Sequence, residues 1–128
     1  MALDHGSVRT GVAISDQTAT LARPLSVLDR VETDTGFSVL LGVIRSEAPG
    51  LIVVGLPVSL DGREHAQARR ARAFSARLAA AVDLPVALYD ERFTSRLADQ
   101  RGGRAARDAR AAATLLEEYL RTIGDRQP

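Results

Sequence analysis

The chain has 128 residues, a net charge of +1 and no cysteine. This length is enough for one domain that buries about two thirds of its unfolded surface, and we predict a single domain over residues 1–128. The lack of cysteine excludes disulfide frameworks and thiolate metal sites, and no apolar run approaches the ~18 residues of a membrane span. We therefore expect a cytoplasmic protein with no membrane partner.

All 17 basic side chains are arginine. The guanidinium group is planar and suits bidentate contacts with phosphate or carboxylate. Six of these arginines fall between residues 92 and 110, where only Asp99 and Asp108 oppose them. Because this stretch lacks the large apolar residues of a membrane-binding helix, it predicts contact with a nucleic-acid backbone; a solvated helix face is the alternative.

The first sixteen residues predict a hairpin around an unusual aspartate. Apolar residues 2–3 and 12–14 flank a polar connector that contains Gly6, so we expect one strand to end near Asp4 and a second to cover residues 11–15. A carboxylate inside an apolar strand is costly without a partner. Asp4 should therefore sit at a sheet edge, pair with a cation or bind a metal ion; a turn-initiating aspartate is the alternative.

The next segments alternate between strand and helix patterns. Residues 21–28 predict an edge strand, because their proline cannot donate to a ladder. Apolar residues recur at helical spacing after an N-cap at Thr33 or Asp34, and this predicts a helix that ends at residues 48–50. The continuous apolar run over residues 51–57 predicts a strand buried on both faces, hence a parallel one.

A capping-box-like start at residues 61–64 predicts the following helix, which ends at residues 83–85 before a strand over residues 86–90. A last helix is expected from Asp108, with Gly124 as its C-cap. Alternating strands and helices with short connectors predict an α/β fold, in which the antiparallel opening strands join the edge of a parallel sheet.

The positions of three carboxylates are explained better by a chemical role than by a role in folding. Asp4 ends the first strand, Glu91 follows the last one, and Asp108 shares a helix stripe with Ala112 and Leu115, which turns it toward the sheet. Ligands of open α/β sheets gather outside the carboxyl ends of the strands. The alternatives are a solvated strand end for Glu91 and a dipole-favoured helix start for Asp108.

Converging carboxylates without cysteine predict Mg²⁺ or Mn²⁺ as the cofactor. Two such ions about 3.5–4 Å apart can activate a water molecule and stabilise the leaving oxygen of a phosphodiester. His5 follows Asp4 but should face the opposite side of the sheet, so we expect a structural role for it.

The order of the motifs resembles the YqgF/RuvX family. The matching segments are LDHGSVRTGVAISD, ARPL, IVVGLPVSLDG, LYDERFTS and a terminal D-x-x-x-A-A-x-L-L-x-x-Y-L. That family consists of ribonuclease-H-like proteins, described as Holliday-junction-resolvase-like and as nucleases proposed for the 5′ end of pre-16S ribosomal RNA. The resemblance implies a ribonuclease-H-like fold, with a five-stranded mixed sheet flanked by helices.

The resemblance also implies roles for single residues. Asp4, Glu91 and Asp108 match the family's catalytic and metal-binding acids. Four residues match structural turn positions: Gly6, Gly11, Gly55 and Pro57. Five arginines are predicted to contact the nucleic acid: Arg9, Arg92, Arg96, Arg104 and Arg107.

We therefore expect a divalent-metal-dependent nuclease that acts on RNA, at the 5′ end of pre-16S rRNA, or on branched or single-stranded DNA. One alternative is a Holliday junction resolvase of recombination and repair, which should be a homodimer because two symmetric cuts require two-fold symmetry. Another is a non-catalytic RNA-binding factor of ribosome assembly. An ATPase of the actin and sugar-kinase type would need two such domains. A monomer and a homodimer both stay open.

Overall fold

The computed structural model describes residues 1–16, 18–19, 21–57, 65–90 and 104–126, with only the backbone described for residues 104–108 and 123–126. The elements within these ranges are β1 (Ala2–Asp4), β2 (Arg9–Ser15), β3 (Ala22–Asp29), α1 (Asp34–Glu47), β4 (Ile52–Leu56), α2 (Ala66–Ala81), β5 (Val86–Asp90) and α3 (Arg104–Arg126).

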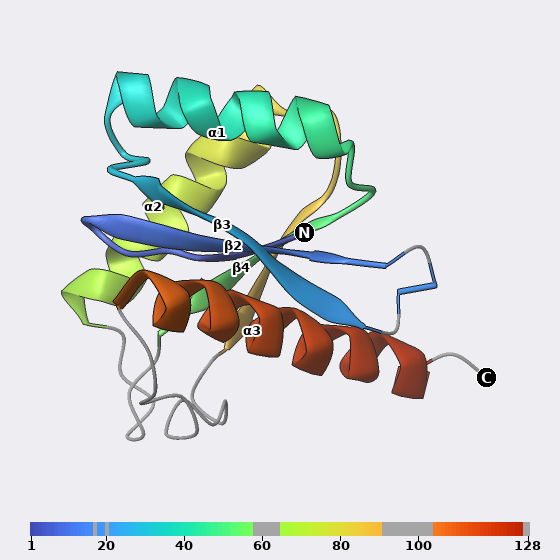
Figure 1. The fold of residues 1–128 in the computed structure, drawn as a ribbon. Coiled ribbons are helices and arrows are strands. Elements are labelled where there is room, and N and C mark those ends of the chain that lie inside the picture. Colours follow the sequence, from blue (N-terminus) through green and yellow to red (C-terminus); the bar gives the residue numbers. More distant parts are fainter. Residues whose placement is uncertain (17, 20, 58–64, 91–103, 127–128) are drawn as a thin grey trace.

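The strands form one mixed sheet in the order β3-β2-β1-β4-β5. The first three strands pair as an antiparallel meander, whereas β4 runs parallel to β1 and to β5. Helices α1 and α2 cover one face of the sheet and α3 covers the other, as Figure 1 shows. The predicted α/β fold with a five-stranded mixed sheet flanked by helices is confirmed.

Strands β3 and β4 have the position and the burial that the sequence predicts. All five residues of β4 are buried, as expected for a central parallel strand. Strand β3 lies at a sheet edge, where Pro24 pairs with Ala13 next to an irregularity in the register after Val12. A missing N–H group is tolerated there because no further strand needs it.

Helix α1 begins and ends at the predicted residues. Its N-cap is Thr33, whose hydroxyl oxygen accepts a hydrogen bond of 3.0 Å from the Gly36 N–H group. Its C-cap is Ala48, which adopts a left-handed conformation with φ of 48° and donates its N–H group to the Ile44 carbonyl. Pro49 follows and cannot continue the helix.

Several boundaries differ from the prediction. Helix α2 begins at Ala66 with an extended His65 as its N-cap, so the predicted start at residues 61–64 is wrong. Strand β2 begins at Arg9, two residues before the predicted start at Gly11. Helix α3 begins at Arg104 and continues past Gly124 to Arg126, so the predicted start at Asp108 and the predicted C-cap at Gly124 are both wrong. Arginine and alanine are strong helix formers and extend α3 backward, and a glycine near the end costs only about 1 kcal/mol.

The two faces of the sheet carry different cores. The α1/α2 face is filled by large side chains: Met1, Leu3, Val12, Val31, Phe37, Leu40, Ile44, Ile52, Val54, Phe74 and Leu78. The α3 face is built mainly from smaller ones: Ala2, Ala13, Val53, Ala112, Ala113, Leu115 and Leu116. Alternation along β1 sends Ala2 and Leu3 to opposite cores, as expected for a strand.

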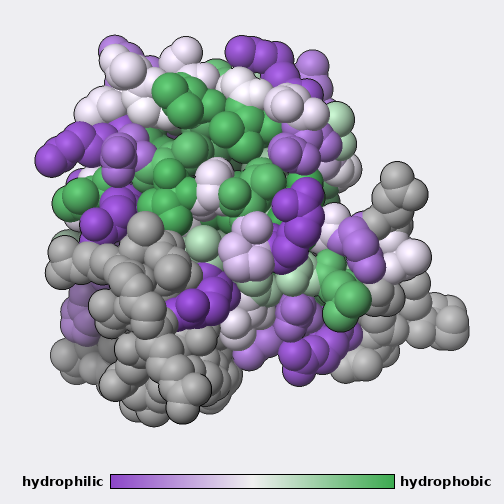
Figure 2. Space-filling model, in the orientation of Figure 1, coloured by the Kyte–Doolittle hydropathy of each residue, from purple (hydrophilic) through white to green (hydrophobic). Residues whose placement is uncertain are grey.

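Part of the apolar surface stays open to solvent. Figure 2 shows hydrophobic side chains gathered over α1 and the neighbouring strand edge, with hydrophilic residues around them. Val39 on α1 is 52% exposed. None of the helices within the described residues combines the length and the hydropathy that a membrane span requires. The single domain, the cytoplasmic location and the choice between monomer and homodimer stay predictions.

Candidate active site

Three strands have their carboxyl ends at the same end of the sheet. Strands β1, β4 and β5 are parallel, and the register pairs Leu3 with Val54 and Leu56 with Asp90. The last residues of β1 and β5, Asp4 and Asp90, therefore lie at the same end of the sheet, separated by the width of β4. This is the end at which ligands of α/β sheets gather.

Asp4 lies between glycines. It pairs with Gly11 on β2, and one step beyond the Leu3–Val54 pair the register with β4 reaches Gly55. Ala2, two residues before Asp4, packs in the core under α3, so alternation directs Asp4 to that face as well. Neither glycine places a side chain beside this half-buried carboxylate.

Two of the predicted turn glycines are strand residues. Gly11 lies inside β2 and Gly55 inside β4, so the turn role predicted for them is wrong. Gly6 does lie in the β1–β2 connector. A Cβ atom there would come within 2.3 Å of the Arg9 carbonyl oxygen, which leaves no space for a side chain. Pro57 follows β4 directly.

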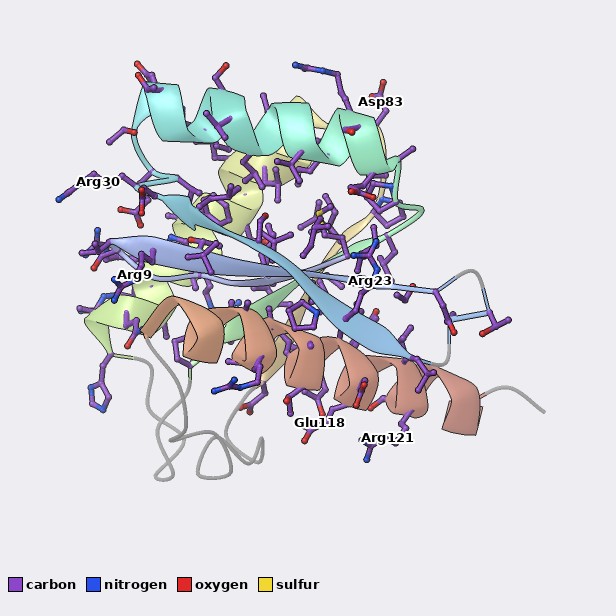
Figure 3. The ribbon with its side chains drawn as sticks, in the orientation of Figure 1. Arg9, Arg23, Arg30, Asp83, Glu118 and Arg121 are labelled. Carbon is purple, nitrogen blue, oxygen red and sulfur yellow. The ribbon has the colours of Figure 1, made fainter. Side chains whose placement is uncertain are left out.

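Arg9 is the predicted phosphate contact that the structure describes in full. It begins β2, is half-buried and pairs in register with Asp29 on β3. Figure 3 shows Arg9 and Arg30 at the same end of the molecule, on the side where α3 begins. Both guanidinium groups are thus near the end of the sheet that carries Asp4.

Helix α3 runs from the Asp4 end of the sheet to the opposite end. Its second half borders a cavity of about 470 Å³, which Leu116 and Leu120 line together with Met1 and Gly50 at the amino ends of β1 and β4. The first half therefore extends toward the carboxyl ends of these strands, as Figure 1 also shows. Asp108 lies in this half, one helical turn before the fully buried Ala112.

The remaining predicted site residues are not described. Arg104, Arg107 and Asp108 belong to the first turns of α3, where only the backbone is described. Glu91, Arg92 and Arg96 lie outside the described residues, as does the predicted capping box at residues 61–64. The described side chains include no group of three His, Cys, Asp or Glu that could hold a metal ion. Asp4 is the one predicted ligand in that set, so the three-acid site stays a prediction.

Behind Asp4 the structure contains a polar cluster that sequence reasoning missed. His5 is 5% exposed, and its ring stacks on Phe74 of α2 with centroids 4.6 Å apart. Its Nε2 atom lies 3.0 Å from Oε1 of Glu32, whose other carboxylate oxygen accepts a hydrogen bond of 2.5 Å from Arg70. His5 thus faces the side opposite Asp4, as predicted, and is deeply packed. Glu32 carries no sequence signal, because its partners are 27 and 38 residues away.

Burial and charge act together in this cluster. Burial lowers the pKa of His5, an effect that nearby Glu32 opposes and Arg70 reinforces. The hydrogen bond from Arg70 lowers the pKa of Glu32. At neutral pH we therefore expect a neutral His5 beside a charged Glu32–Arg70 pair.

A family model described as RuvX, Holliday junction resolvase, matches residues 1–122. The chain belongs to the RuvX family. This RuvX chain is 40% identical over 129 residues to a "Putative pre-16S rRNA nuclease" of Maridesulfovibrio salexigens, covering 94% of the chain and 96% of the relative. A protein of the same name from Chromobacterium violaceum is 41% identical over 100 residues, covering 78% of the chain and 73% of the relative.

A solved structure supports the fold assignment. The chain is similar to "T. thermophilus RuvC in complex with Holliday junction substrate", with a TM-score of 0.56, 16% sequence identity and coverage of 97% of this chain and 94% of that one. At this identity the likeness confirms the ribonuclease-H-like fold alone. The family and the names of the relatives place the RuvX chain among nucleases.

Proposed function

We propose that this RuvX protein is a divalent-metal-dependent nuclease that processes the 5′ end of pre-16S rRNA. The observation that carries the proposal is the environment of Asp4: a carboxylate at the carboxyl end of β1, with glycine on both neighbouring strands. A carboxylate is a hard oxygen donor of the kind that Mg²⁺ and Mn²⁺ prefer. The curated relatives at 40% identity carry a name for this rRNA activity.

Asp4, Glu91 and Asp108 would hold the ions. Two arguments support Glu91: it directly follows β5, and Tyr89, two residues earlier, packs on the α3 face that Asp4 also faces. One argument supports Asp108: it precedes the buried Ala112 by four residues, and such a pair shares one helix face. The proposal requires these three acids to meet at one end and on one face of the sheet.

When bound, two divalent ions activate a water nucleophile and stabilise the leaving oxygen of the phosphodiester. The three carboxylates would hold the divalent ions in place. Arg9 begins β2 near this end of the sheet, and its guanidinium group would hold a substrate phosphate through paired hydrogen bonds. Arg92, Arg96, Arg104 and Arg107 would extend this contact along the nucleic-acid backbone.

A Holliday junction resolvase is the second candidate, because the matching family model is described by that activity. Such an enzyme would act as a homodimer, so that two active sites cut two strands symmetrically. The third candidate, a non-catalytic RNA-binding factor of ribosome assembly, predicts binding without cleavage.

The test is a side-by-side digestion in Mn²⁺ of a 16S precursor RNA, single-stranded RNA, single-stranded DNA and a four-way junction. We expect cleavage of the precursor RNA, and a loss of roughly a thousandfold in the Asp4→Asn and Asp108→Asn variants with the fold retained. Asp83→Asn is the matched control, because Asp83 is exposed and lies at the other end of the molecule in Figure 3.

Each outcome selects one candidate. Preferred cutting of the junction by a dimer selects the resolvase. No cleavage of any substrate by the purified protein in Mn²⁺ selects the non-catalytic factor. Full activity of Asp4→Asn would overturn the metal site.

A further inference from the structure

The turn between β3 and α1 holds one arginine in a rare backbone conformation. Arg30 has a φ of 47°, in the left-handed region that favours glycine over residues with a Cβ atom. Its carbonyl oxygen accepts two hydrogen bonds from Thr33, at 3.0 Å from the N–H group and at 2.7 Å from the hydroxyl group. A Cβ atom on Gly36 would come within 2.0 Å of the same carbonyl oxygen, so a side chain does not fit there. The turn therefore fixes the backbone of Arg30 closely.

The same turn is joined to the connector that follows Asp4. The Arg30 N–H group donates a hydrogen bond of 2.8 Å to the carbonyl oxygen of Val8, between β1 and β2. Arg9, the next residue, pairs in register with Asp29, which directly precedes Arg30. Arg9 and Arg30 are thus neighbours in space although they are far apart in the sequence.

Arg30 lies at the end of the sheet that carries the candidate active site. Strand β2 is antiparallel to both β1 and β3, so the carboxyl ends of β1 and β3 lie at the same end. Figure 3 shows Arg9 and Arg30 together at this end, and Arg23, near the start of β3, toward the other. Neighbouring strands lie about 4.8 Å apart, which puts the ends of β1 and β3 roughly 10 Å from each other.

The positive charge of Arg30 is available to a ligand. Its side chain is exposed, and no hydrogen bond or ion pair joins its guanidinium group to any residue that the structure describes. Two arginines of α2 differ in this respect, because they form ion pairs: Arg70 with Glu32 and Arg77 with Asp34. An unpaired guanidinium group can donate paired hydrogen bonds to a phosphate.

Stability alone does not explain an arginine at this position. Glycine adopts a positive φ without strain, and asparagine and aspartate do so more readily than other residues with a side chain. Residues held in a strained backbone conformation cluster at active sites and ligand-binding sites. The turn thus indicates a role for the guanidinium group of Arg30, which the fold itself does not use.

We propose that Arg30 is a further phosphate contact of this protein, which binds the nucleic-acid backbone about three nucleotides from the bond that is cut. The proposal rests on the proposed function, since it counts from the metal site at Asp4. Nucleotides of a stacked strand rise about 3.4 Å each, so roughly 10 Å between the ends of β1 and β3 corresponds to about three of them. Arg9 on β2 lies between and holds a phosphate closer to the cut. The substrate then crosses the ends of the meander from Asp4 past Arg9 to Arg30.

The test measures binding of a fluorescein-labelled, single-stranded RNA from the 5′ end of the 16S precursor, by fluorescence anisotropy in EDTA so that no cleavage occurs. Arg30→Gly removes the guanidinium group and suits the left-handed φ, so its melting temperature should stay close to that of the wild type. We expect its Kd at low salt to rise about tenfold. The slope of log Kd against log salt should fall by about 0.7, the value for one phosphate of a single strand.

Two further variants show what the contact requires. Arg30→Lys keeps the positive charge, so it should keep the salt slope while it loses the paired hydrogen bonds. Arg23→Ala is the matched control, because Arg23 is an exposed arginine of the same strand at the other end. We expect Arg23→Ala to bind the RNA with the Kd and the slope of the wild type.

A set of RNAs that each contain one uncharged methylphosphonate linkage locates the contact. Neutralising the linkage that Arg30 binds should weaken binding of the wild type but not of Arg30→Gly, because both changes remove the same contact. We expect this linkage about three nucleotides from the bond that the wild type cuts in Mn²⁺.

The outcomes separate the two proposals. Suppose that the wild type cleaves the RNA in Mn²⁺. The contact at Arg30 is then overturned, and the proposed function stands, if Arg30→Gly binds with the Kd and the slope of the wild type, if Arg23→Ala loses as much, or if every linkage affects Arg30→Gly and the wild type equally. A melting temperature of Arg30→Gly far below that of the wild type would make Arg30 a structural residue and also overturn the contact. If the wild type does not cleave the RNA, both proposals are overturned, because the contact is counted from the cut.

Discussion

Adjacent residues at the end of β1 have different surroundings on the two faces of the sheet. On the α1/α2 face, His5 is packed against Phe74 and closed in by Glu32. On the α3 face, Asp4 is half-buried between Gly11 and the register position of Gly55. One face buries the side chain at the end of β1, and the other has glycines on both sides of the carboxylate. The comparison shows that adjacent residues at the end of one strand can serve packing on one face and carry a polar group on the other.

The side-chain sizes explain how both faces can be stable. Small residues such as Ala112 and Ala113 fill part of the core between α3 and the sheet, next to Leu115. On that face Tyr89 and Tyr119 meet edge to face with centroids 5.9 Å apart. The α1/α2 face instead depends on large interlocking side chains. A change of residue size should therefore damage the two faces in opposite ways.

The largest effect on stability is expected from Leu40→Ala on the α1/α2 face. Leu40 is fully buried, and the cavity should lower the free energy of unfolding by about 2–5 kcal/mol. Urea denaturation measures this loss, with Val39→Ala at the exposed neighbouring position as the control. Cleavage per folded molecule should stay unchanged, and a comparable loss in Val39→Ala would show that the face does not depend on packing.

On the α3 face we expect damage from added volume. Ala112→Leu should overpack this face and cost about 1–3 kcal/mol of unfolding free energy. Because the change pushes α3 away from the sheet one turn after Asp108, cleavage by the folded protein should also fall. The control is Ala111→Leu, at a half-buried position outside this core. Equal cleavage by both variants would argue against a site under the first turns of α3.

The smallest effect concerns the pH dependence of stability. The hydrogen bond from Arg70 lowers the pKa of Glu32 below its ordinary 4.5 in the folded protein. The unfolded chain therefore binds this proton more readily, and stability should fall as the pH drops below 4.5 and through the lowered pKa. From neutral to acidic pH, the urea midpoint of the wild type should fall further than that of Glu32→Gln. The difference should be small because Glu32 is one third exposed.

Much of the fold could be read from local patterns. The strand around Asp4, the N-cap at Thr33 and the buried strand β4 each follow from residues that are neighbours in sequence. The ends of α3 could not be read in this way. A glycine at position 124 signals a helix end by propensity alone, but a long amphipathic helix packed on a sheet overrides a penalty of about 1 kcal/mol.

By itself the sequence determined the elements, the family and the candidate acids, because periodicity, caps and motif order are short-range properties of the chain. Only the tertiary structure decided that Gly11 and Gly55 stand beside Asp4 and that Glu32 reaches His5 from behind. Those neighbours depend on strand order and on packing between distant segments. Such contacts form only when the whole sheet closes, so no local pattern encodes them.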